Sequence, residues 1–265
     1  MEYFAIYLGV GIAAGFLAGL LGVGGGLIIV PALGLVFAAQ HYPTAHIHHA
    51  ALGTSLACIM LSAMASLREH HAHGAVNWAI VRALTPGIVL GTLIGALIAV
   101  AIPARPLKLF FALFVFYAAT QLFLNIKPKP TRQLPASAGM WGVGGLIGAV
   151  SSLVGIGGGT LSVPFMLWCN VPGHHAIGTS AALGFPIALA GTVGYMAGGL
   201  SVSGLPEYSL GFIYLPALAG IALASVLTAP LGARAAHRLP VNTLKKGFAV
   251  FLYLIGARMA LSLLS

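Results

Sequence analysis

Eight long apolar segments make up most of this chain of 265 residues. Six of them are close to the roughly 20 residues that a helix needs to cross the hydrocarbon core of a bilayer. Only 6% of the residues are Asp, Glu, Lys or Arg, whereas soluble domains carry about 25%. Because so few charged side chains cannot make the surface of a protein soluble in water, we predict an all-α integral membrane protein. The segments span approximately residues 3–39, 50–67, 83–102, 109–126, 136–169, 176–200, 208–233 and 247–264.

The first and fifth segments are too long for a single crossing, and each contains a glycine cluster. The first cluster reads GVGGGLIIVP (22–31) and the second reads GIGGGTLSVP (155–164). Each interior glycine costs a helix about 1 kcal/mol relative to alanine, so consecutive glycines should interrupt it. We predict that a first helix ends near Leu21 or Val154, and that a second begins near Leu27 or Thr160.

The chain is a duplication of one unit. HAALGTS (49–55) returns as HHAIGTS (174–180), and FALFVFY (111–117) returns as FAVFLY (248–253). A polar stretch that is stiffened by prolines, NIKPKPTRQLP, joins the two halves. The predicted organisation is a first membrane repeat over 1–126, a cytoplasmic linker over 127–135 and a second membrane repeat over 136–265.

The basic residues indicate how the two halves are oriented. If each glycine-rich segment crosses once, the two sides carry five and six basic residues, which is no bias. If each doubles back, nine lie on one side and only Arg105 and Lys108 on the other. Basic loops are typical of the cytoplasmic side, so we predict two inverted-topology repeats with both termini outside the cytoplasm. Each repeat has a glycine-broken re-entrant or half-length helix pair plus three spanning helices. The net charge of +9 then reflects orientation rather than nucleic-acid binding.

The helix starts that follow the glycine clusters can bind an anion. The first amides of a helix lack partners within it and carry a partial positive charge, and successive glycines can turn several amides toward one point. Inverted repeats would bring two such starts together near the bilayer midplane. The other interpretation is that the glycines only allow close helix packing, as we expect for Gly11, Gly15, Gly19, Gly91 and Gly95. The residues predicted to bind substrate at the clusters are Gly24, Gly25, Gly26, Leu27, Gly157, Gly158, Gly159 and Thr160.

A Gly-Thr-Ser sequence recurs in the following helix of each half. We predict that the hydroxyls of Thr54, Ser55, Thr179 and Ser180 donate to substrate oxygens without adding a fixed charge. The alternative is that these side chains bond to carbonyls of their own helix or join two helices.

Histidines cluster at positions 41–49, at 70–73 and at 174–175. HIHH and HHAH could indicate Zn or Cu, but the predicted topology separates the first cluster from the second. His49 and His174 each precede a Gly-Thr-Ser by four residues, and we expect them to line the outer mouth as gating residues. A transition-metal transporter or intramembrane metalloprotein that uses these clusters remains the alternative function. The preferred interpretation requires no metal site and no cofactor.

Acidic residues are rare, and the only three are Glu2, Glu69 and Glu207. Cation carriers usually place carboxylates within the membrane, so a cation substrate is disfavoured. Arg258 is the only basic residue deep within an apolar segment, and its counterpart in the first half is Gln121. This pair is a candidate for giving the pathway polarity. The two cysteines, Cys58 and Cys169, are expected to be small buried apolar residues.

GVGGG–P and GIGGG–P, with Gly-Thr-Ser downstream, resemble the TauE/SafE sulfite exporter-like permeases. The resemblance covers the length, the duplication, the glycine motifs and the position of the linker. It implies a secondary transporter, not an enzyme, that exports sulfite, an organosulfonate or another small sulfur-containing anion across the cytoplasmic (inner) membrane. Export of an anion from a negative interior gains about 2.3 kcal/mol per charge per 100 mV, so no coupling cation is required. The longer loop of the first repeat and the additional histidines depart from the internal duplication.

Overall fold

The protein is almost entirely helical in a computed structural model, which describes residues 2–21, 25–125, 129, 131–236 and 241–264. Eight of the described helices are long and apolar enough to cross a membrane, and α2 and α7 are shorter. The predicted all-α membrane fold is therefore confirmed. The helices of the first half are α1 (Glu2–Leu21), α2 (Gly26–Ala39), α3 (Ile47–Ala72), α4 (Trp78–Ala101) and α5 (Ala104–Phe123). Those of the second half are α6 (Ser137–Val154), α7 (Gly159–Trp168), α8 (Gly173–Gly199), α9 (Leu215–Ala236) and α10 (Val241–Leu264).

Both glycine clusters interrupt the helices where the sequence predicts. The first helix of each pair ends at Leu21 or Val154, and the second begins at Gly26 or Gly159. The two helices of a pair differ in length, however. Both α1 and α6 are long enough to span a membrane, whereas α2 has 14 residues and α7 has 10. The predicted half-length helix therefore applies only to the second helix of each pair, α2 or α7.

The helices of the two halves pack in exchanged pairs. Helix α1 of the first half packs along α9 of the second, and α6 of the second half packs along α4 of the first. In the centre, α3 packs against α8, and α5 packs against α10. Glycines make the exchanged contacts close. A Cβ on Gly15 would lie 2.5 Å from the Cα of Ser225, and one on Gly95 would lie 2.8 Å from the Cα of Ala149. The close-packing role expected for these two glycines is confirmed.

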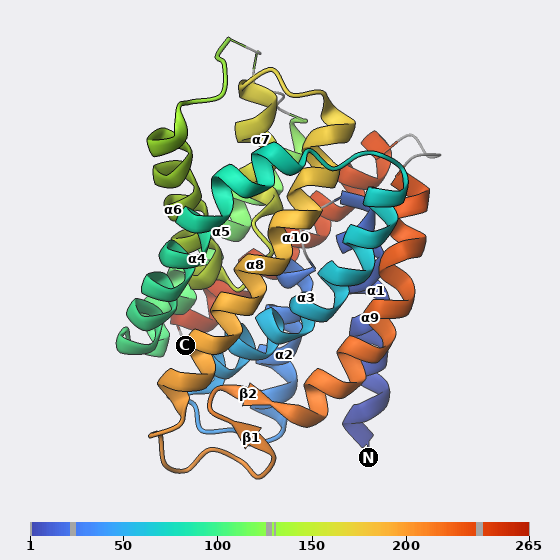
Figure 1. The fold of residues 1–265 in the computed structure, drawn as a ribbon. Coiled ribbons are helices and arrows are strands. Elements are labelled where there is room, and N and C mark those ends of the chain that lie inside the picture. The colour runs from blue at the N-terminus through green and yellow to red at the C-terminus, as the bar shows by residue number, and fades with distance from the viewer. Residues whose placement is uncertain (1, 22–24, 126–128, 130, 237–240, 265) are drawn as a thin grey trace.

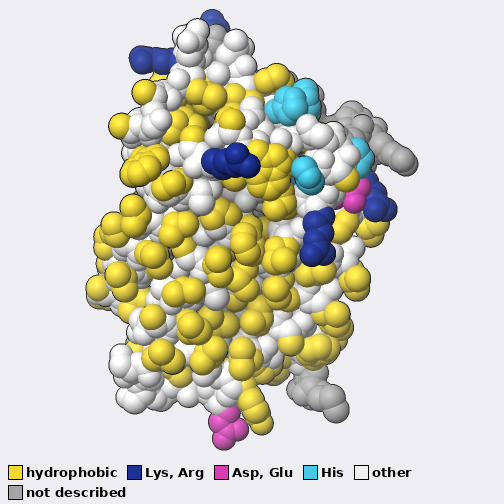
Figure 2. Space-filling model, viewed as in Figure 1, with side chains coloured by type: hydrophobic (Ala, Val, Ile, Leu, Met, Phe, Trp, Pro, Cys, Tyr) yellow, Lys and Arg dark blue, Asp and Glu magenta, His cyan; other side chains and the backbone are white. Residues whose placement is uncertain are grey.

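The two ends of the molecule differ in character. The N-terminal end of α1 and the hairpin of β1 (Ser209–Leu210) and β2 (Ile213–Tyr214) lie at the lower end in Figure 1, and residues 131–136, which lead into α6, lie at the upper end. A broad apolar surface lies between these ends. On the face shown in Figure 2, the Lys and Arg side chains gather in the upper half. This distribution is typical of a protein with one charged end beside a membrane.

Candidate functional site

The second helix of each pair starts from a left-handed glycine. Gly25 precedes α2 with φ 62°, and Gly158 precedes α7 with φ 77°. Residues with a side chain rarely adopt this conformation. Neither N-cap glycine supplies a side-chain hydrogen bond to the first turn. The amides at these two helix starts are therefore not occupied by a side chain of the cap residue itself.

The two breaks lie against each other inside the protein. A Cβ on Gly26 would overlap the carbonyl oxygen of Gly155 and would lie 3.0 Å from the Cα of Ile156. The hydroxyl of Ser55, on α3, donates a 2.9 Å hydrogen bond to that same Gly155 carbonyl. Ser55 thus ties the central helix of the first half to the break of the second half. Gly24 lies outside the described residues.

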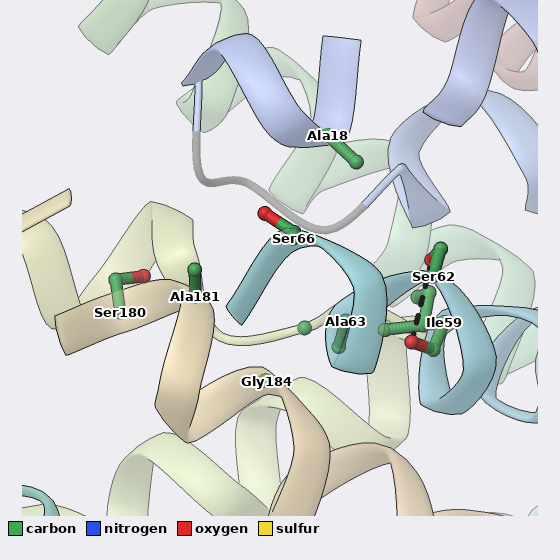
Figure 3. Close-up of a pocket in the computed structure, with 9 residues that line it drawn as sticks. Ala18, Ile59, Ser62, Ala63, Ser66, Ser180, Ala181 and Gly184 are labelled. Atoms are coloured by element: carbon green, nitrogen blue, oxygen red, sulfur yellow. Dashed lines mark hydrogen bonds between the residues drawn. The ribbon is translucent and has the colours of Figure 1, made fainter. Parts of the chain in front are cut away.

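A narrow cavity adjoins the second break. Its lining comes from α1, α3, α8 and the turn before α7, and its volume is about 20 Å³, which is room for about one water molecule. An oxyanion would therefore need these helices to separate. In Figure 3, Ser66 on α3 and Ser180 on α8 lie on different sides of the space between these helices. Ala18 lies above both in this view. The lining residues are Ala18, Ile59, Ser62, Ala63, Ser66, Gly157, Ser180, Ala181 and Gly184.

Two of the lining serines, Ser62 and Ser66, are absent from the predicted site. They lie on the same face of α3 as Ser55, at spacings of 7 and 11 residues, which is the signal that could have identified them. The hydroxyl of Ser62 donates to the carbonyl of Ile59 in its own helix. Ser66 is 4% exposed, and its hydroxyl has no hydrogen-bond partner among the described residues.

The recurring threonines make contacts between helices. The hydroxyl oxygen of Thr54 accepts a 3.0 Å hydrogen bond from the N–H of Tyr214, just before α9. That of Thr179 accepts a 2.9 Å bond from the N–H of Asn77, just before α4. The two bonds occupy corresponding positions in the two halves. They favour the alternative in which these hydroxyls join helices, and a role in substrate binding stays a prediction for Thr54 and Thr179.

The remaining predicted residues at the breaks are well buried. Leu27 is 1% exposed and belongs to the apolar core, whereas Thr160 is 5% exposed. The hydroxyl of Ser180 lies 3.0 Å from that of Ser162. The structure therefore brings Gly157 and Ser180 to the cavity, while Leu27 lies in the core.

The histidines do not form one group. His49 is 4% exposed, and its Nε2 lies 3.2 Å from the carbonyl of Ala99 and 3.0 Å from that of Ile102. Since carbonyls only accept, Nε2 carries the proton and caps the end of α4. His174 is exposed at the start of α8, at the opposite end of the molecule in Figure 1. His49 and His174 therefore do not line a common mouth. Within the described residues, no group of three or more His, Cys, Asp or Glu side chains could hold a metal ion.

Neither Gln121 nor Arg258 lines the cavity. They lie on α5 and α10, which pack against each other, and Arg258 is exposed on the surface of α10. Their role in giving the pathway polarity stays a prediction. The cysteines are both buried and free, and burial raises the pKa of the Cys169 thiol, between α7 and α8.

A second cavity, of about 430 Å³, lies at the lower end. Its lining includes Tyr3, Gln40 and Tyr214. This end also contains the longer loop of the first repeat, in which His41 adopts φ 56°. This cavity is much larger than the narrow cavity beside Gly157.

Eight apolar spans, two interrupted helices in contact and an uncharged cavity between central helices are features of a multi-pass membrane transporter. Comparison with known proteins agrees. Residues 7–259 match the family described as Sulfite exporter TauE/SafE, and the chain belongs to this family. The resemblance predicted from the glycine and Gly-Thr-Ser motifs is thus confirmed.

Several curated relatives are similar over most of their length. A probable membrane transporter protein of Haemophilus influenzae is 42% identical over 95% of this chain and 96% of its own. In Bacillus subtilis, the probable membrane transporter protein YdhB is 26% identical over 90% of this chain and 91% of its own. YunE of the same organism, with the same description, is 27% identical over 74% of this chain and 79% of its own. No solved structure matches the chain.

Proposed function

We propose that the protein exports a small sulfur-containing oxyanion, such as sulfite or an organosulfonate, through the space between the two glycine breaks. The contact of Gly26 with Gly155 and Ile156 carries this proposal, because it joins the interrupted helices of both halves at one place. Backbone irregularity at membrane depth is tolerated where it is buried in protein or lines a cavity. The cavity beside Gly157 meets that condition.

The chemistry of the lining supports an anion without a counter-ion. The nine described lining residues are Ser, Ala, Gly and Ile, all uncharged. Hydroxyls and helix-start amides donate hydrogen bonds, and they require no proton release or cation to do so. The described conformation holds only about 20 Å³ of free space, so we assign it to a closed stage of the transport cycle.

We further propose that the two halves are inverted repeats and that both termini face outward. The exchanged pairing of α1 with α9 and of α6 with α4 supports a two-fold relation between the halves. The nine basic residues that the predicted topology places together support a cytoplasmic upper end. A cytoplasmic membrane with a negative interior then drives the anion outward.

Purified protein in proteoliposomes tests this function. A potential that is negative on the side of the linker should drive sulfite or a simple organosulfonate away from that side, at a rate that rises with the potential. The test variant is Gly26→Ala, which disturbs the contact between the breaks and should lower the flux per folded molecule, and its matched control is Gly34→Ala. If no sulfur oxyanion crosses faster than in empty liposomes, or if flux ignores the potential, the proposal fails.

A further inference from the structure

The two halves differ in polarity around their glycine breaks. Positions 133 residues apart correspond, as the two clusters show. The first half has apolar side chains where the second half has hydroxyls. The pairs are Ala18 with Ser151, Leu27 with Thr160, and Ile29 with Ser162. At these three positions, the duplication retains the break in both halves but places hydroxyls only in the second half.

Two of these hydroxyls are buried without a partner. Ser151 is 0% exposed and Thr160 is 5% exposed, and neither hydroxyl has a hydrogen-bond partner among the described residues. Burying a hydroxyl without a hydrogen bond is unfavourable. A Cβ placed on Gly158 would lie 3.4 Å from the hydroxyl of Ser151. Ser151 therefore faces the left-handed residue from which α7 starts, and Thr160 belongs to the first turn of that helix.

The start of α7 adds backbone donors to these hydroxyls. Gly158 gives this turn no side-chain cap, and the amides of a first helical turn attract negative charge. Gly157 on one side of the turn lines the cavity, as does Ser180, whose hydroxyl is 3.0 Å from that of Ser162. Ser151 faces Gly158, and Gly158 directly follows the cavity-lining Gly157 and lies two residues before Thr160.

We propose that Ser151, Thr160 and the first turn of α7 form a one-sided cradle that binds a singly charged oxyanion. This inference rests on the proposed function and names the half that recognises the substrate. In the first half, Ala18 and Leu27 occupy the positions of these two hydroxyls, and they supply shape and closure.

The neutral donors explain the preference for a single charge. The cost of transferring an ion out of water rises with the square of its charge, and buried ions need compensating partners. Hydroxyls and amides compensate one charge better than two. Hydrogen sulfite and organosulfonates carry one charge, whereas sulfate carries two.

Thr160→Val and Ser151→Ala test the cradle with little change in volume. Because the hydroxyls they remove are buried without a partner, both variants should be at least as stable as the unchanged protein. Each should weaken the apparent affinity for methanesulfonate in a proteoliposome flux assay by about tenfold or more, the scale of a hydrogen bond to a charged group. The control is Thr192→Val, whose hydroxyl donates to Ala188 in its own helix, and it should retain the affinity.

The outcomes separate this inference from the proposed function. Methanesulfonate flux in the unchanged protein with full affinity in both variants would overturn the cradle and leave the transporter intact. A loss of stability that equals the loss of affinity would also overturn it, since that indicates a structural role. Competition by sulfate as strong as that by methanesulfonate would overturn the preference for one charge. If no sulfur oxyanion is transported, the proposed function fails first.

Discussion

Gly26→Ala tests whether the two glycine breaks must touch. Its steric cost at that contact should outweigh the ordinary preference of a helix for alanine over glycine. The three atoms nearest to a Cβ on Gly26 are all backbone, namely the oxygen and carbon of Gly155 and the Cα of Ile156. Backbone atoms cannot rotate aside as the end of a side chain can. Overpacking of this kind costs about 1–3 kcal/mol, and shifting the second break adds to the cost.

Gly34→Ala is a matched control in the same helix. Nothing lies within 4 Å of a Cβ on Gly34, and an alanine in a helix interior is favoured over glycine by about 0.5–1 kcal/mol. The two variants should therefore differ in free energy of unfolding by roughly 2–4 kcal/mol, with opposite signs relative to the unchanged protein.

Denaturant unfolding in lipid or detergent, with helix content as the signal, measures this difference. Flux per folded molecule in proteoliposomes should fall in Gly26→Ala and stay unchanged in Gly34→Ala. Equal stability and equal flux in the two variants would show that the breaks do not need to touch, and the reasoning from the Gly26 contact would be refuted.

Four further substitutions test individual contacts. Ser55→Ala should lower the free energy of unfolding by about 1–3 kcal/mol, because it leaves the buried carbonyl of Gly155 without its donor. Ser62→Ala should cost clearly less, and equal losses in denaturant unfolding would contradict this. His49→Ala should destabilise by about 1–3 kcal/mol through the uncapped carbonyls at the end of α4, with unchanged substrate preference in flux assays; altered preference would instead support gating. Glu69→Gln should leave the unfolding midpoint almost unchanged, because the Arg234 partner is largely exposed; a large shift would show that the pair locks α3 to α9.

The interruptions of the helices could be predicted because glycine acts locally. Three adjacent glycines destabilise a helix whatever surrounds them, so the ends at Leu21 and Val154 follow from sequence alone. The pairing of α1 with α9 and of α6 with α4 could not be predicted in the same way. Those contacts join residues far apart in the sequence, such as Gly15 with Ser225 and Gly95 with Ala149, and glycine spacing shows that a helix has a close partner without showing which one.

The site was predicted in part for a similar reason. Gly157 and Ser180 line the cavity, and their motifs recur in both halves. Recurrence proved a poor guide to the hydroxyls, since Thr54 and Thr179 recur because both accept bonds from the chain before the next helix. Ser66 and Ser151 do not recur, and burial without a hydrogen-bond partner among the described residues distinguishes them in the structure. Duplication thus indicates what the two halves share, whereas the proposed cradle lies at positions where they differ.

The central claim is that substrate passes through the cavity lined by Ser66. Ser66→Cys, in a chain whose Cys58 and Cys169 are replaced by alanine, places a single thiol there. Its rate of modification by N-ethylmaleimide in proteoliposomes, with and without methanesulfonate, is the direct measurement. The account predicts slow modification that becomes several times slower as methanesulfonate saturates transport. Modification at the same rate with and without a transported anion would contradict it.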